Sequence, residues 1–176
     1  MITEKSIKMI QAEMHKDFFD RCRYAIESGF YLEAIFMEYA AMEGRIEVLL
    51  GLLGAPCNNN LPPEQRRKTQ ISHRINCFSK SDKYEVLFEK SKLNKSFWKK
   101  MKLWTDKRNG FVHGLYKNEI QYKNRLSDKK YAEEGLEICR MLYNETNRLK
   151  RLKKKSPEMF DNLLVCSSKD CVMKVI

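Results

Sequence analysis

Apolar residues recur at every third or fourth position over most of this chain, which is the spacing typical of amphipathic α-helices. The pattern predicts a first helix over residues 3–28 and a second over 31–53, with Gly29 as the stop between them. The second helix is the more apolar and is expected to be the central helix of the core. Its apolar positions are Leu32, Ile35, Phe36, Tyr39, Met42, Ile46 and Leu49.

The clearest interruption of this pattern lies at residues 54–63, where a glycine, three prolines and three consecutive asparagines come close together. The further helices that the pattern predicts cover residues 63–77, 83–88, 95–114 and 128–155. A polar hairpin over 118–127 should lead into the last of them. Ser127 or Asp128 is its expected N-cap, and Pro157 ends it.

Together these elements predict an all-α fold, an antiparallel helical bundle of about five helices. The 176 residues suit one domain over 1–155, followed by a C-terminal tail over 156–176. A hydrophobic fraction of 43% argues against disorder, and the 7 glycines and 4 prolines leave long uninterrupted helices. Gly135 inside the last helix is unfavourable by about 1 kcal/mol relative to Ala, which does not overturn the prediction. Trp98 and Trp104 occupy apolar positions and are expected in the core, although exposed indoles also stack on bases.

The net charge of +11, from 34 Lys and Arg against 23 Asp and Glu, favours a polyanionic partner. Nucleic acid, here RNA, is the first expectation, and an anionic surface or an acidic protein comes after it. The densest basic run, RLKRLKKK, ends the last predicted helix. It is either an RNA-contacting patch or a solvated helix end, where cations also interact favourably with the helix dipole. Its basic residues are Arg148, Lys150, Arg151, Lys153, Lys154 and Lys155.

Several classes of protein are not expected. No apolar run approaches the roughly 18 residues of a membrane span, and the N-terminus is charged throughout, so we expect a cytoplasmic protein without a membrane partner. The six cysteines include no C-x-x-C pair, which favours reduced thiols. No residues show metal-ligand spacing, and the glycines form no phosphate-binding loop. The sequence therefore predicts no metal and no cofactor, and argues against ATP hydrolysis and nicotinamide chemistry.

Residues 107–116, KRNGFVHGLY, bring Arg108, Asn109 and His113 to the end of a predicted helix. On a helix, Asn109 and His113 share a face, whereas Arg108 and His113 lie about 140° apart. A site using all three therefore needs far-reaching side chains, a distortion at Gly110 or a second copy of the chain. A guanidinium, an amide and an imidazole that titrates near neutrality suit chemistry on a phosphate. A purely structural role is the alternative at each position.

The pattern R-N-x-x-x-H, late in a helix of a basic, all-helical chain, resembles the signature of the HEPN superfamily (higher eukaryotes and prokaryotes nucleotide-binding). The segment YLEAIFMEYAAMEGRIEVLL, residues 31–50, resembles an earlier core helix of that family. The resemblance covers about residues 31–152 and implies a HEPN-like bundle that forms a homodimer, with two motifs in one cleft. It implies a metal-independent endoribonuclease of a toxin–antitoxin or other defence system, with an antitoxin or neighbouring-gene protein as a further partner. The alternative is a HEPN-like dimer that has lost activity and only binds nucleotide, RNA or protein.

The resemblance also implies a role for each motif residue. His113 would be the general acid–base when an RNA 2′-OH attacks its adjacent phosphorus. Arg108 would hold the phosphate and its developing charge, and Asn109 would orient the imidazole or the phosphate. The products would be a 2′,3′-cyclic phosphate and a 5′-hydroxyl. Glu38 or Glu43 would be a polar helper from the earlier helix, although either could instead form a salt bridge at the surface or in the core.

Overall fold

The structure, a computed structural model, describes residues 4–53, 71, 74, 75, 78, 91–115, 126–158 and 160. The side chains of residues 4–12, 111–115, 126 and 127 are outside this description. Within the described ranges lie the helices α1 (Glu4–Glu27), α2 (Tyr31–Leu52), α6 (Lys95–Leu115) and α7 (Leu126–Lys155). None of the described residues forms a strand, so the predicted all-α class is confirmed. Within the same ranges, no helix combines the length and the apolar character that crossing a membrane requires.

The turn between α1 and α2 follows directly from its glycine. Gly29 has a φ of 82°, a left-handed conformation that suits a residue without a Cβ. Its N–H donates to the Ile26 carbonyl at 3.2 Å, and the Phe30 N–H donates to the Ala25 carbonyl at 2.8 Å. These two bonds are the Schellman motif, which satisfies the last carbonyls of a helix. The predicted stop at Gly29 is confirmed.

The observed ends of α7 agree only in part with the ends predicted from the sequence. The helix begins at Leu126, so Ser127 and Asp128 lie inside its first turn and the prediction that one of them is the N-cap is wrong. Asp128 still stands where negative charge stabilises a helix N-terminus. At the other end α7 stops at Lys155, two residues before Pro157, as predicted.

Part of the predicted architecture cannot be compared with the structure. The piece over 83–88 and residues 118–125 of the hairpin lie outside the described residues. So does the helix over 63–77, apart from Ile71, Arg74 and Ile75, which are helical and buried.

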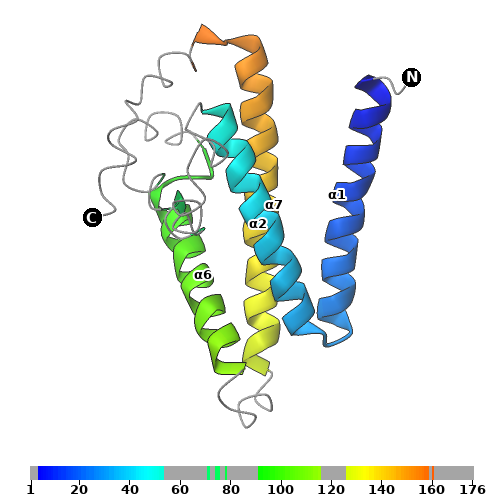
Figure 1. Cartoon of the computed structure of the whole chain (residues 1–176), viewed down its shortest axis with the longest axis vertical. Helices are drawn as coiled ribbons and strands as arrows, with labels where there is room; N and C mark the ends of the chain where they lie inside the picture. Colours follow the sequence, from blue (N-terminus) through cyan, green and yellow to red (C-terminus); the bar gives the residue numbers. More distant parts are fainter. Residues whose placement is uncertain are drawn as a thin grey trace, which may run out of the picture.

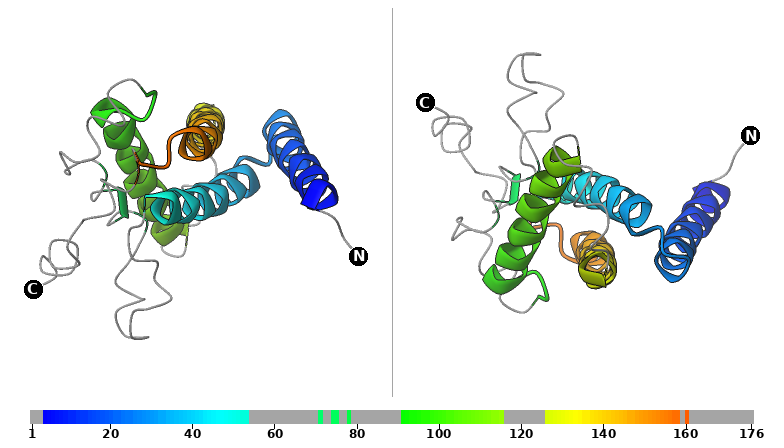
Figure 2. Two further views of the ribbon diagram at one scale, coloured as in Figure 1. Left: turned by 90° about the horizontal axis from the view of Figure 1, so that it is seen from above. Right: turned by 90° about the horizontal axis from the view of Figure 1, so that it is seen from below.

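The described helices form a bundle in three layers (Figures 1 and 2). α2 and α7 lie side by side in the middle, α1 covers one side of this pair, and α6 covers the other. Contacts between Arg45 and Tyr143, and between Lys153 and Leu52, show that α2 and α7 run in the same direction. α1 and α6 run the opposite way (Figure 1). The antiparallel arrangement therefore holds between layers, whereas the central pair is parallel.

The core lies between these layers and is built mainly from α2, α6 and α7. α2 is the central helix, as predicted, and its buried residues are Ala34, Ile35, Glu38, Met42, Ile46 and Leu49. Trp98 and Trp104 are both buried, so neither indole is available to stack on a base. Phe160 is fully buried as well, so the core extends past residue 155.

Candidate functional site

The motif residues lie on an uninterrupted helix. α6 continues from Lys95 through Gly110 and Gly114 to Leu115, and Gly110 does not have a positive φ. A distortion at Gly110 therefore does not bring Arg108 towards His113. Their five-residue separation leaves them about 140° apart around the helix axis. The sequence left three ways to build a site from Arg108, Asn109 and His113. Two of them remain, which are far-reaching side chains and a second copy of the chain.

Arg108 is held by aromatic rings from α2. Its guanidinium carbon lies 4.0 Å from the centre of the Tyr39 ring and 5.1 Å from that of Phe36. Its Nη1 donates to Oδ1 of Asn109 at 3.2 Å. Arg108 is half-buried, and its Nε is buried without a hydrogen-bond partner. The guanidinium is thus fixed between α2 and α6 by cation–π contacts, which are worth about 0.5–2 kcal/mol each.

One turn earlier, a reciprocal pair of hydrogen bonds joins α6 to α7. The indole Nε1 of Trp104 donates to the Tyr131 carbonyl at 3.0 Å, and the Tyr131 hydroxyl donates to the Trp104 carbonyl at 2.5 Å. The two rings also stack, with centroids 5.0 Å apart. Burial, and then the charge of Glu38, raises the pKa of the Tyr131 phenol, so Tyr131 remains a neutral donor. This clamp sets the position of the helix that carries the motif.

Glu38 lies in the core next to this clamp. Its side chain is 0% exposed, and neither carboxyl oxygen has a hydrogen-bond partner. Burial raises its pKa to about 9, so the carboxyl is neutral at pH 7. The buried thiols of Cys22 and Cys139 lie near enough for Glu38 to contribute to their raised pKa values, after burial itself. Neither Arg108 nor Asn109 bonds to the Glu38 carboxyl.

Gly135 of α7 makes room for the Glu38 side chain. A Cβ at this position would lie 2.1 Å from Oε2 of Glu38 and 2.6 Å from Cζ2 of Trp104. Real Cβ atoms essentially never approach other atoms so closely. The glycine that is unfavourable for an isolated helix is therefore required where α2, α6 and α7 meet.

Glu43, the other proposed helper, has a different environment. It is half-buried on α2, one turn beyond Tyr39. Burial, followed by the charge of Glu43, raises the pKa of Tyr39, whereas the charge of Arg108 lowers it. The charges of Glu43 and Arg108 therefore shift the pKa of the Tyr39 phenol with opposite signs. Glu38 and Arg108 shift the pKa of the Tyr131 phenol in the same opposed way, so both proposed helpers lie within electrostatic range of groups that Arg108 also influences.

The basic residues at the end of α7 divide into two groups. In the first, Arg148 pairs with Glu145 at 2.6 Å, Lys153 donates to the Leu52 carbonyl at 2.6 Å, and Lys150 lines a pocket on the α1 side of the bundle. The remaining three are Arg151, Lys154 and Lys155, whose side chains are exposed. Arg151 makes a hydrogen bond, from its Nε to the Asn147 carbonyl at 3.4 Å, and its exposure, like that of the two lysines, leaves it accessible to a polyanion.

The buried Glu38 carboxyl predicts a pH-dependent stability. The folded state keeps this proton up to about pH 9, whereas an unfolded chain loses it near 4.5. The raised pKa therefore gives full stability at low pH, and the free energy of unfolding falls by about 1.4 kcal/mol per pH unit between those values. Glu38→Gln should remove this slope and, at pH 7, raise the free energy of unfolding by about 3 kcal/mol.

Urea unfolding of both proteins at pH 5, 7 and 9, followed by circular dichroism, measures the difference. Glu33→Gln, at an exposed position of the same helix, is the matched control and should leave the slope unchanged. Parallel pH dependences for the wild-type protein and Glu38→Gln would show that the carboxyl is not buried in its neutral form.

The described residues contain no group of three or more His, Cys, Asp or Glu side chains placed to hold a metal ion. The structure places Arg108 and Asn109 together and puts His113 on the last turn of the same helix. In comparisons with known proteins, no family model, no curated protein and no solved structure matches the chain.

Proposed function

We propose that this chain is a metal-independent endoribonuclease of HEPN type that acts in a toxin–antitoxin or defence system. The observation that carries the proposal is the fixed guanidinium of Arg108, which stacks 4.0 Å from Tyr39 and bonds to Asn109 on the helix of His113. A preorganised cation is the group that phosphate chemistry needs most, because negative charge builds on the phosphoryl oxygens in the transition state. The pattern R-N-x-x-x-H and its resemblance to the HEPN signature add to this observation.

The proposed reaction uses the RNA's own 2′-hydroxyl. Its oxygen attacks the adjacent phosphorus and gives up its proton, while the bond from phosphorus to the 5′ oxygen breaks and that oxygen takes a proton. His113 moves these protons as a general acid–base. Arg108 binds the phosphoryl oxygens, and Asn109, already bonded to Arg108, orients the phosphate or the imidazole. The products are a 2′,3′-cyclic phosphate and a 5′-hydroxyl.

The proposed active unit is a homodimer. Because Arg108 and His113 are about 140° apart on an undistorted helix, one chain presents them in different directions. A two-fold axis beside α6 would bring His113 of one protomer towards Arg108 of the other, as an isologous interface allows. The exposed cations Arg151, Lys154 and Lys155 would bind the RNA backbone at a distance from the cut.

Further partners and the location belong to the same proposal. An antitoxin or the product of a neighbouring gene would hold such an enzyme inactive until it is needed. Both described cysteines, Cys22 and Cys139, are free thiols. Free thiols fit a reducing compartment such as the cytoplasm, where the RNA substrate is found.

A binding module without catalytic activity is the second candidate. It is favoured by the half-burial of Arg108 and by the cover that Tyr39 places over one face of the guanidinium. A guanidinium held in this way can bind a phosphate through its free edge without any further chemistry. The two candidates differ in whether the bound RNA is cut.

The test is RNA cleavage by the purified protein in excess chelator, with substitutions at Arg108. Arg108→Ala should lose both binding and cleavage. Arg108→Lys should recover binding better than turnover, because an ammonium lacks the planar fork that matches a phosphate. Lys99→Ala, which removes an exposed cation from the same helix, is the control and should cut normally. RNA binding without cleavage by the wild-type protein would select the binding module instead.

A further inference from the structure

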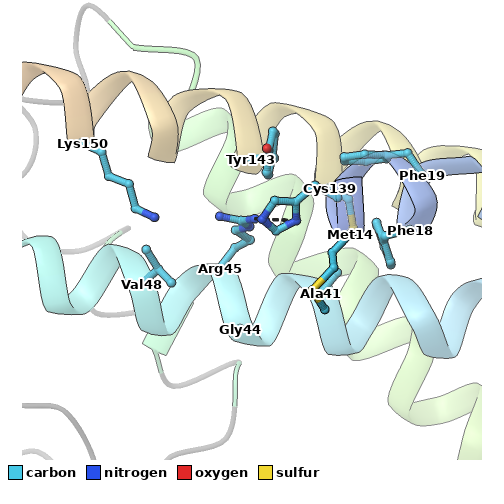
Figure 3. A pocket seen from close by; sticks show the side chains of 11 residues that line it. Met14, Phe18, Phe19, Ala41, Gly44, Arg45, Val48, Cys139, Tyr143 and Lys150 are labelled. Atoms are coloured by element: carbon cyan, nitrogen blue, oxygen red, sulfur yellow. Dashed lines mark hydrogen bonds between the residues drawn. The ribbon is translucent and has the colours of Figure 1, made fainter. Parts of the chain in front are cut away.

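A pocket of about 560 Å³ lies between α1, α2 and α7, on the side of the bundle away from α6 (Figure 3). Pockets of roughly 300–1,000 Å³ are the usual size for small-molecule sites. Much of its wall is apolar or aromatic, and α1 contributes two phenylalanines to it. The lining side chains of this kind are Met14, Phe18, Phe19, Ala41, Val48 and Tyr143.

The polar part of the wall is basic and comes from all three helices. His15 is on α1, Arg45 on α2 and Lys150 on α7. Nη2 of Arg45 lies 2.9 Å from Nδ1 of His15, and the Arg45 guanidinium carbon lies 4.3 Å from the centre of the Tyr143 ring. Figure 3 shows Arg45 and Lys150 extending towards the same space from opposite walls. Three basic side chains therefore converge on one cavity.

No carboxylate lines this pocket to balance those groups. Four acidic residues stand two positions from His15 or Arg45 along α1 and α2, namely Glu13, Asp17, Glu43 and Glu47. None of them lines the pocket, and two are held in ion pairs, Asp17 with Arg21 and Glu47 with Arg74. Burial and mutual repulsion lower the pKa of His15, and burial followed by the charge of Arg45 lowers that of Lys150. Arg45 and Lys150 are thus held close together, and the charged form of His15 is disfavoured beside them. An anion in the pocket would relieve both effects.

We propose that this pocket binds a small phosphate monoester that carries an aromatic ring system, with the phosphate on Arg45, His15 and Lys150 and the ring against Phe18, Phe19 and Tyr143. A dianionic phosphate suits three basic groups better than a carboxylate does, and the planar fork of Arg45 can bind two of its oxygens. Aromatic side chains prefer offset-stacked or edge-to-face neighbours. The wall already holds such pairs, with Phe18 and Phe19 at 5.1 Å and Phe19 and Tyr143 at 5.8 Å between centroids.

This site is separate from the motif on α6. Ala41, Gly44 and Val48 line the pocket from one face of α2, whereas Phe36 and Tyr39 hold Arg108 from the opposite face. The inference therefore does not rest on ribonuclease activity. A free nucleoside monophosphate and an aryl phosphate are the two sources of the same chemistry.

The experiment is titration calorimetry at pH 7 with 1-naphthyl phosphate and adenosine 5′-monophosphate as probes, and with 1-naphthol and inorganic phosphate as the two halves of the first probe. One molecule of probe should bind per chain, and the tighter probe tells which source the pocket prefers. Each half should bind at least about tenfold more weakly, because it lacks either the charge or the ring.

Lys150→Met keeps the length of the side chain and removes its charge, and it should weaken the binding of the probe about tenfold or more. Lys130→Met makes the same change at an exposed position of the same helix and should bind as the wild-type protein does. Arg45→Gln provides a second variant from the facing helix and should also bind weakly. The absence of saturable binding up to millimolar probe, or equal affinity in wild type and Lys150→Met, would overturn the proposal.

Discussion

His113→Ala is expected to lower RNA cleavage by about 10²–10⁴-fold, the usual contribution of a general acid–base. The fold and the dimer should survive, because His113 lies on the last turn of α6, one residue before Gly114. RNA binding should change little, since Arg108 and the exposed cations of α7 remain. Initial cleavage rates in excess chelator, together with circular dichroism and the mass in solution, measure these three properties separately.

Lys99→Ala, an exposed truncation on the same helix, is the control for general effects on α6 and should cut at the wild-type rate. Two results would contradict the role of His113. Full activity in His113→Ala would remove this residue from the chemistry, and a variant that fails to fold or to dimerise would make it a structural residue.

Gly135→Ala is expected to destabilise the protein by about 3 kcal/mol, the upper end of the range for overpacked cores. Alanine favours an isolated helix by about 1 kcal/mol over glycine, so local propensity predicts the opposite sign. The new methyl group would lie 2.1 Å from Glu38 and 2.6 Å from Trp104. The indole of Trp104 cannot move aside easily, because its hydrogen bond to Tyr131 and its stacking hold it in place.

A double-mutant cycle with Glu38→Ala identifies the cause. Because the truncated side chain leaves space for the new methyl group, the double variant should be less destabilised than the sum of the two single variants. Gly44→Ala is the matched control, since a Cβ there meets nothing within 4 Å, and it should stabilise α2 by up to about 1 kcal/mol. Additive effects in the cycle, measured by urea unfolding, would show that Gly135 does not make room for Glu38.

The described helices are largely predictable from the sequence, because hydrophobic periodicity and glycine chemistry act locally. Gly29 specifies its turn through a single φ value, and the four ranges agree within one or two residues at each end. The parallel pairing of α2 with α7 is not predictable in this way. It depends on which apolar faces fit together across the whole bundle, and the spacing along one helix does not determine that fit.

The same distinction, between what the local sequence determines and what depends on contacts between helices, applies to the surroundings of the candidate site. Glu38 stands on the apolar stripe of α2, three residues after Ile35 and four before Met42, and this position is a signal of burial that the sequence does contain. The reason for Gly135 is absent from the sequence of α7, because it lies in side chains of two other helices. The stacking of Arg108 on Tyr39 is also a contact between distant segments.

The sequence contains a weak indication of the pocket between α1, α2 and α7. His15 lies three, four and seven residues before Phe18, Phe19 and Cys22, so a basic residue occupies the apolar face of α1. Its meeting with Arg45 depends on the packing of α1 on α2. A periodic pattern can therefore mark an unusual residue without showing which residues it will meet.

The central claim, that the RNA's own 2′-hydroxyl is the nucleophile, is tested most directly by comparing two substrates of one sequence. One is all-ribo and the other is 2′-deoxy throughout, and both are incubated with the wild-type protein in excess chelator. The account predicts that only the all-ribo strand is cut and that its fragments end in a 2′,3′-cyclic phosphate and a 5′-hydroxyl. An all-ribo strand that remains intact, or cleavage of the 2′-deoxy strand, would contradict it.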